Sequence, residues 1–511
     1  MKTNIPNWEP ENESFWNSTG KAIARKNLFI SVPALLVAFS TWMLWSIITV
    51  QMKNLGFPFD DQQLFNLSAI AGLAGATLRI PNAFLIAISG GRNVIAYTTQ
   101  LLLIPALGIG IALQDPNTSY FTFIVLAALS GIGGGNFASS MSNISFFFPK
   151  KMQGAALGIN AGIGNLGVSV MQVFVPMAMT VGLFGAAGGA GYELSKNGVV
   201  SLVYIQNSGL IWVPVLIVLF FLARAGMNNL PVSDTSSTFV AVMKATGLIL
   251  IGFIGASLGI WLMFFMKWNL WIVLPITILF TLGLMRLIPG KVQENLKKQF
   301  AIFSNRHTWV MTVLYIMTFG SFIGYSAALP LLIKIVFGAP LADGTSNPDA
   351  PNPFAYAWLG PLVGSLIRPV GGWLSDKVGG AKVTLWNTVV MILAALGVAW
   401  TVIQARQAGS PVDFFMPFLL LFLLLFVTTG IGNGSTFRMI PVIFEPAQAG
   451  PVLGWTSAIA AYGAMIVPKV FGEQVKAGTP EYALFGFTIF YVLCLILCWW
   501  FYARKNAEKP C

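Results

Sequence analysis

Apolar runs about 20 residues long recur along the whole chain and are separated by short polar segments. A helix needs about 20 apolar residues to cross the ~30 Å hydrocarbon core of a bilayer. The pattern therefore predicts fourteen spanning helices, ordered six, two and six. We expect them near residues 28–51, 67–88, 94–113, 120–144, 154–180, 203–223, 246–266, 270–288, 308–333, 355–373, 383–403, 414–434, 450–468 and 483–502.

Composition supports an all-α integral membrane protein, because only 9% of the residues are charged, against about 25% in soluble domains. The net charge of +12 follows the topology. With the N-terminus in the cytoplasm, cytoplasmic segments hold 20 of the 29 Lys and Arg residues and outer segments hold seven. This bias matches the positive-inside rule. It predicts a multi-pass protein of the cell inner membrane with both termini cytoplasmic, and no nucleic-acid partner.

The order of spans divides the chain into five parts. We expect a cytoplasmic tail at 1–27, a six-helix bundle at 28–224, a linker at 225–306 with a transmembrane hairpin at 246–288, a second six-helix bundle at 307–503, and a cytoplasmic tail at 504–511. The first 27 residues are polar and show no cleavable signal peptide, so the first span is expected to act as its own insertion signal.

Two cations remain inside predicted spans, Arg79 and Arg368. An arginine at the centre of a bilayer costs about 2.5–3.5 kcal/mol on insertion scales, and such residues usually mark a functional site. The acidic residues all fall in tails, loops or span ends of the predicted topology. The membrane interior is thus predicted to hold two permanent charges and no carboxylate to neutralise them.

An internal repeat relates the two arginines. "GATLRIPNAFLIAISGG" (75–91) aligns with "GSLIRPVGGWLSDKVGG" (364–380) at an offset of 289, with the glycine, the arginine and the closing Gly-Gly in register. Two parallel six-helix halves describe the major facilitator architecture, whose substrate sites lie near the midplane between the halves. We therefore predict that the two guanidinium groups face each other and grip one oxyanion. The alternative is that each arginine only hydrogen-bonds helix carbonyls; snorkelling is excluded by their depth.

Glycine-rich stretches flank this predicted site. "GIGGGNFASSM" (131–141) and "GAALGINAGIGNLG" (154–167) indicate closely packed helices. Close packing does not explain Asn136 and Asn165, whose amides need partners in hydrocarbon. Tyr315 and Phe319 lie one turn apart, a spacing that suits packing as well as a site. The single histidine, His307, opens its span, where a structural role is favoured over proton relay.

Other functional classes lack the residues they need. A membrane enzyme that reduces the bound oxyanion would require haem, iron–sulfur or molybdenum ligands, and the chain has one histidine and three cysteines near its C-terminus. We expect no enzyme activity, no cofactor and no metal. A membrane anion sensor would require a cytoplasmic output domain, and the predicted cytoplasmic segments are short.

Several motifs together resemble the nitrate/nitrite porter family (NarK-type) of the major facilitator superfamily. They are "GATLRIPNAF", "GGGNFASSMSNISFFFPKK" and "GINAGIGNLG", and "GWLSDKVGGAKV" (372–383) resembles the superfamily's loop motif, in which Asp376 is expected to cap the helix junction. The resemblance implies that Arg79 and Arg368 clamp the anion and that Asn165 supports it. It further implies walls formed by Phe137, Tyr315 and Phe319, with Ser457 lining the site.

The function implied is a nitrate/nitrite transporter working by alternating access. Because no titratable group is predicted within the pathway, we favour nitrate/nitrite antiport, with nitrate–proton symport as the alternative. The partners expected are nitrate, nitrite and the lipid bilayer, and the protein is expected to act as a monomer. The family has twelve core helices, so the hairpin 246–288 is an addition that we expect to be peripheral.

Overall fold

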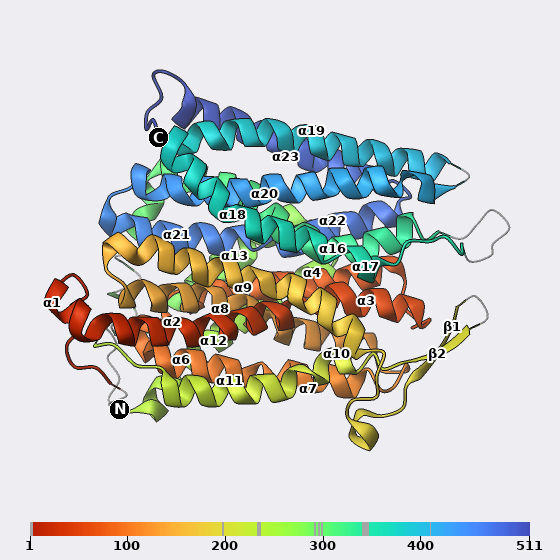
Figure 1. Ribbon diagram of the computed structural model, residues 1–511, viewed down its shortest axis with the longest axis horizontal. Coiled ribbons are helices and arrows are strands. Elements are labelled where there is room, and N and C mark those ends of the chain that lie inside the picture. Colours follow the sequence, from red (N-terminus) through yellow and green to blue (C-terminus); the bar gives the residue numbers. More distant parts are fainter. Residues whose placement is uncertain are drawn as a thin grey trace.

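The computed structural model describes residues 4–196, 199–231, 237–290, 293–294, 297, 300–339, 347–408 and 410–511, apart from the side chains at 150–151, 153–155, 196, 446–447 and 450. Long helices run side by side along one axis, and the N- and C-termini lie at the same end of them (Figure 1). We call this end the terminal side and the opposite end the far side. The all-α membrane architecture predicted from the hydropathy pattern is confirmed.

The first half is built from helices that are often interrupted. α4 begins in a capping box between Asp60 and Gln63, and Pro81 lies in its last turn. Because the cap precedes the apolar run, the helix starts six residues before the predicted span.

The elements of the first half are α1 (Glu13–Phe15), η1 (Trp16–Gly20), α2 (Lys21–Trp42), α3 (Trp45–Asn54), α4 (Asp61–Asn82), α5 (Leu85–Ser89), α6 (Gly91–Leu101), α7 (Leu103–Ala112), α8 (Tyr120–Phe147), α9 (Lys150–Ala178), η2 (Gly185–Gly188), α10 (Asn207–Leu210) and α11 (Trp212–Gly226).

The second half follows the hairpin α12 (Thr238–Ile260), η3 (Trp261–Phe265) and α13 (Leu270–Arg286). Its elements are η4 (Ala301–Ser304), α15 (Arg306–Tyr315), η5 (Ile316–Gly320), α16 (Ser321–Val336), α17 (Pro353–Tyr356), α18 (Leu359–Val378), α19 (Gly380–Gln407), η6 (Pro411–Phe414), α20 (Phe415–Ile443), α21 (Pro446–Ala460), α22 (Gly463–Lys476), α23 (Glu481–Cys498) and η7 (Trp499–Ala503).

Two details differ from the sequence-based expectation. An antiparallel hairpin, β1 (Tyr192–Lys196) and β2 (Val199–Val203), lies on the far side between α9 and α10 (Figure 1). Among the described residues, 12 helices are both long and apolar enough to span a membrane. α13 is shorter, with 17 residues, and α18 has the length but carries three charged residues. The predicted count of fourteen is therefore supported only roughly.

The repeat reappears as glycine-mediated packing in each half. A Cβ at Gly134 of α8 would lie 2.8 Å from the Cα of Gly75 on α4, and one at Gly430 of α20 would lie 2.3 Å from the carbonyl oxygen of Gly364 on α18. Both halves therefore bring the arginine-bearing helix into backbone contact with its neighbour. The closing Gly-Gly has the same role in both copies: Gly90 and Gly379 join consecutive helices at φ +80° and +102°, values that favour glycine.

The two halves meet closely on the far side. A Cβ at Gly72 of α4 would lie 2.3 Å from the backbone of Ala464 on α22. Gln172 of α9 donates to the Ser326 carbonyl at 3.1 Å. Near the terminal side, by contrast, a Cβ at Gly158, Gly162 or Gly372 would meet no atom within 4 Å. The halves are therefore in backbone contact on the far side.

The hairpin α12–α13 is more closely attached than predicted. Side chains at Gly252 and Gly255 would collide with Leu78 of α4 and with Thr281 of α13, respectively. Its tip also reaches the second half, because Lys469 Nζ lies 5.1 Å from the ring centroid of Phe264. Lys469 is buried within α22 beside Glu473, at 3.1 Å. Glycines therefore let the inner face of α12 pack on α4, the helix that carries Arg79. That the hairpin is peripheral to transport stays a prediction.

Replacing Gly255 with leucine is expected to destabilise the protein. A Cβ there would lie 2.0 Å from Thr281 Oγ1, so α12 must move, and overpacking of this kind costs about 1–3 kcal/mol. Thermal unfolding in detergent measures the effect. Gly247→Leu is the matched control on the same helix, because its Cβ would meet nothing within 4 Å. Equal melting temperatures for the two variants would contradict close packing of the hairpin.

Candidate functional site

Arg79 lies fully buried where the two halves meet. Its Nε donates to the Gly134 carbonyl of α8 at 2.9 Å, and its Nη1 donates to the Ser457 carbonyl of α21 at 3.0 Å. The glycine packing of α4 on α8 exposes the first of these carbonyls to the guanidinium. The arginine therefore bonds one backbone acceptor in each half. This agrees in part with the alternative in which the arginines only hydrogen-bond helix carbonyls.

Aromatic rings surround the same guanidinium. Its Cζ lies 4.6 Å from the ring centroid of Phe137 and 5.2 Å from that of Phe319. Phe39 and Trp42 of α2 lie within 6 Å as well. Cations are attracted to the faces of such rings, most strongly where both are desolvated. The rings therefore stabilise a buried charge without neutralising it.

Arg368 occupies the equivalent position on α18 and is buried. Its Nη2 donates to the hydroxyl of Tyr315 at 3.3 Å, and its Cζ lies 5.0 Å from the ring centroid of Phe437. Tyr315 ends α15, directly before the π-helical turn η5. Such turns are frequent at functional sites because they redirect side chains within a continuous helix. Here the turn separates Tyr315 from Phe319.

A stack of rings connects the two arginines. Phe137 stacks on Phe319 with ring centroids 6.1 Å apart, and Phe319 stacks on Tyr315 with centroids 5.5 Å apart. Phe137 comes from the first half and the other two rings come from the second. The sequence-predicted residues Arg79, Phe137, Phe319, Tyr315 and Arg368 thus form one continuous chain of contacts across the interface.

One Nη group of each arginine makes no hydrogen bond to the described residues. Arg79 Nη2 and Arg368 Nη1 are buried and have no hydrogen-bond partner among the described residues. No carboxylate in the described part of the chain pairs with either arginine. An unpaired buried charge is strongly unfavourable, and a buried donor without an acceptor costs about 1–3 kcal/mol more. The arrangement is therefore suited to a small anion that supplies acceptors and negative charge together.

Comparisons with known proteins decide the family. The chain is 38% identical over 510 residues to a protein named probable nitrate/nitrite antiporter NarK2 from Thermus thermophilus, covering 99% of this chain and 98% of the relative. It is 37% identical over 528 aligned residues to nitrate/nitrite transporter NarU of Escherichia coli (strain K12), covering 99% and 97%. The chain belongs to the nitrate/nitrite porter family. No protein-family model matches it.

Solved structures show the fold of this porter. It superposes on a D-xylose–proton symporter with a TM-score of 0.60 at 14% identity, covering 95% of this chain and 98% of the other. It superposes on tetrameric PepTSo2 with a TM-score of 0.57 at 13% identity, covering 93% and 97%. The major facilitator architecture predicted from the repeat is confirmed.

Two predicted site residues are placed differently from the rest. Ser457 meets Arg79 through its backbone carbonyl, while its hydroxyl donates to the Gly454 carbonyl at 2.9 Å. Asn165 is buried, and its Oδ1 has no partner among the described residues. No described hydrogen bond connects Asn165 to either arginine, so its supporting role stays a prediction.

Sequence reasoning missed several residues of the porter's site. Gly134 contributes a carbonyl, Phe39 and Trp42 contribute rings beside Arg79, and Phe437 contributes a ring beside Arg368. Gly134 lay within a glycine run that we had assigned to helix packing. The aromatic residues could not be identified from their sequence spacing. Aromatic residues are common in membrane spans, and only the packing of helices places these rings beside an arginine.

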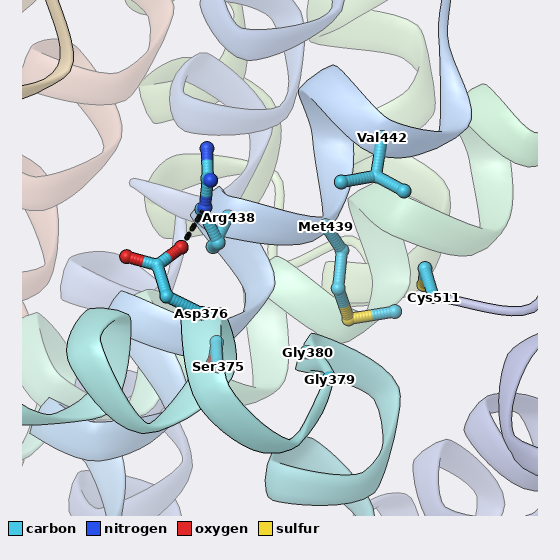
Figure 2. A pocket seen from close by; sticks show the side chains of 8 residues that line it. All are labelled: Ser375, Asp376, Gly379, Gly380, Arg438, Met439, Val442 and Cys511. Atoms are coloured by element: carbon cyan, nitrogen blue, oxygen red, sulfur yellow. Dashed lines mark hydrogen bonds and ion pairs between the residues drawn. The ribbon is translucent and has the colours of Figure 1, made fainter.

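The loop motif of the second half forms a separate hollow, which Figure 2 shows. Ser375, Asp376, Gly379, Gly380, Arg438, Met439, Val442 and Cys511 line it. Asp376 pairs with Arg438 of α20, whereas α19 begins without a side-chain cap. The expected capping role of Asp376 is therefore wrong: its carboxylate ties α18 to α20 instead. The hollow lies on the terminal side, within the second half and apart from the arginine pair.

His307 anchors the C-terminal segment. Its Nδ1 lies 3.1 Å from the Tyr502 hydroxyl, and its Nε2 lies 3.1 Å from Glu508 Oε1. Arg306 beside Glu508 holds the pKa of that carboxyl below its usual value. These contacts lie at the terminal end of α15, whereas Tyr315 and Arg368 lie deep within the bundle. The geometry supports the structural role favoured for this histidine.

Proposed function

We propose that this porter exchanges nitrate for nitrite by alternating access, with one anion held between Arg79 and Arg368. The observation that carries the proposal is the pair of unpartnered buried donors, Arg79 Nη2 and Arg368 Nη1, one from each half. Two guanidinium forks bind a planar oxyanion with charge-assisted hydrogen bonds, which are about twice as strong as neutral ones. The aromatic stack of Phe137, Phe319 and Tyr315 walls the anion from both halves.

Transport follows from rocking of the halves 28–224 and 307–503 about this site. The present arrangement is closed on the far side through Gly72 and Ala464. The contact from Arg79 to the Ser457 carbonyl crosses between halves, so it can form and break as they move. No covalent step is required, and we assign no catalytic residue and no cofactor.

We propose the membrane orientation of the porter from the distribution of its charges and from the position of both termini on the same side. Lys and Arg are concentrated in the segments on the terminal side, which places both termini in the cytoplasm of an inner-membrane protein. The state described is then closed towards the outside. One chain contains both arginines and the walls between them, so a monomer suffices for exchange.

Counterflow in proteoliposomes tests the proposed function. Vesicles loaded with nitrite should take up labelled nitrate from outside while nitrite leaves, because the same site serves both anions. Protein-free vesicles of the same lipid and vesicles carrying Arg79→Ala protein are the controls. Uptake by loaded proteoliposomes that does not exceed uptake by protein-free vesicles would refute the proposal.

A further inference from the structure

The hydroxyl of Ser365 is one of three buried serine hydroxyls, with those of Ser89 and Ser208, that have no hydrogen-bond partner among the described residues. Serines in helices usually bond the carbonyl four residues earlier. Ser326 does so with Phe322, at 2.7 Å, and Ser375 does so with Gly371, at 2.8 Å. Ser365 is 4% exposed, and its Oγ has no hydrogen-bond partner among the described residues. A buried hydroxyl without a partner is rare in native structures and requires an explanation, such as a functional role or an ordered water or ion.

Ser365 lies on the face of α18 that carries Arg368. Residues three apart are neighbours on a helix surface, so the hydroxyl lies one turn from the guanidinium, towards the far side. A Cβ at Gly364 would lie 2.8 Å from the ring of Phe322 on α16, and one at Gly371 would lie 2.2 Å from the Ile431 carbonyl oxygen on α20. Arg368 also contacts α20, because its Cζ lies 5.0 Å from the ring centroid of Phe437. Ser365 therefore lies one turn from a guanidinium at the contact between α18 and α20.

Helix α9 of the other half packs against α18. Ser169 Oγ donates to the Trp358 carbonyl at 2.9 Å, and the two helices run in opposite directions. Asn165 lies one turn from Ser169 on α9, and its Oδ1 is unpartnered as well. Ser365, Asn165 and Arg368 therefore each carry an unpartnered polar atom on two helices that contact each other across the halves.

We propose that Ser365 is a third donor to the bound anion and that it distinguishes nitrate from nitrite. This inference rests on the proposed function. Nitrate is planar with three oxygens, whereas nitrite has two. The unpartnered donors of Arg79 and Arg368 serve two oxygens from opposite sides, and the Ser365 hydroxyl serves the third oxygen, which only nitrate possesses.

The repeat makes this donor a property of one half only. The offset of 289 places Ala76 of α4 where α18 has Ser365, and Ala76 is fully buried. The first half therefore offers a methyl group at the equivalent position. The symmetric pair of arginines binds either anion, and the unsymmetric hydroxyl adds discrimination.

Binding of sodium nitrate and sodium nitrite to purified Ser365→Ala protein tests the inference by calorimetry. Removal of one hydrogen bond to a charged ligand costs enough free energy to weaken nitrate binding about tenfold. Nitrite affinity should change by less than about twofold, because its oxygens keep their arginine donors. Ser365→Thr keeps a hydroxyl and should restore the wild-type ratio of the two affinities. Ser326→Ala removes a hydroxyl that is satisfied within its own helix and is the matched control.

The outcomes separate the two proposals. If Ser365→Ala weakens nitrate and nitrite equally, or neither, Ser365 is not the discriminating donor, while anion binding by the arginines stands. If wild-type protein binds neither anion, the proposed function itself fails. Thermal unfolding checks that each variant is folded. If the alanine variant does not fold, the Ser365→Thr variant decides: a ratio of nitrate to nitrite affinity that differs from the wild-type ratio would overturn the inference.

Discussion

Replacing Arg368 with lysine is expected to weaken nitrate binding by at least about tenfold, since one hydrogen bond to a charged group contributes about 1.5–3 kcal/mol. Lysine keeps the positive charge but loses the planar fork of donors. In the wild type, Arg368 Nη2 donates to Tyr315, while Nη1 has no hydrogen-bond partner among the described residues. A single ammonium cannot hold the tyrosine and one face of a planar anion in the same geometry.

The measurement is the nitrate affinity of purified Arg368→Lys protein, with Arg79→Lys as the symmetry-related variant. Arg406→Lys provides a matched control, because Arg406 pairs with Glu481 away from the site and its replacement should leave affinity unchanged. Thermal unfolding confirms that each protein is folded. Wild-type affinity in a folded Arg368→Lys protein would rule out the clamp.

The second expected result concerns coupling: a proton gradient alone should not drive nitrate accumulation. Arginine stays protonated in proteins, so pH cannot switch the site between charged and neutral. The empty site carries two positive charges, and one bound monovalent anion lowers that to one. Coulomb and desolvation terms in a low-dielectric interior then favour closure around the loaded site. The carrier should therefore reorient readily when loaded and reluctantly when empty.

Nitrate uptake should be fast into proteoliposomes that contain nitrite or nitrate and slow into vesicles that contain an impermeant buffer anion. Adding a pH gradient to the second kind of vesicle should leave uptake slow. Accumulation driven by the pH gradient alone would favour nitrate–proton symport instead. In that event His307→Gln is the first variant to measure, because His307 and Glu508 are a titratable pair at the terminal end of α15.

Much of this porter could be predicted from its sequence, because the relevant properties are local or repeat along the chain. Apolar run length defines spans one at a time, and the offset of 289 identifies Arg79 and Arg368 as equivalent positions. The same local reasoning misplaced the start of α4, where a polar cap precedes the apolar run, and it overlooked the hairpin of β1 and β2. It also treated Asp376 as a cap, because its partner Arg438 is 62 residues away in the chain.

By itself, then, the sequence determined the membrane class, the two related halves, the buried arginine pair and the family. Only the tertiary structure decided which donors of those arginines stay free, since Gly134 and Ser457 satisfy Arg79 from segments 55 and 378 residues away. It also decided that α12 packs on α4 and α13 through Gly252 and Gly255. The tertiary structure likewise decided that the Ser365 hydroxyl has no hydrogen-bond partner among the described residues. The physical reason is that hydropathy and spacing describe one helix at a time, whereas hydrogen-bond satisfaction depends on which helices pack together.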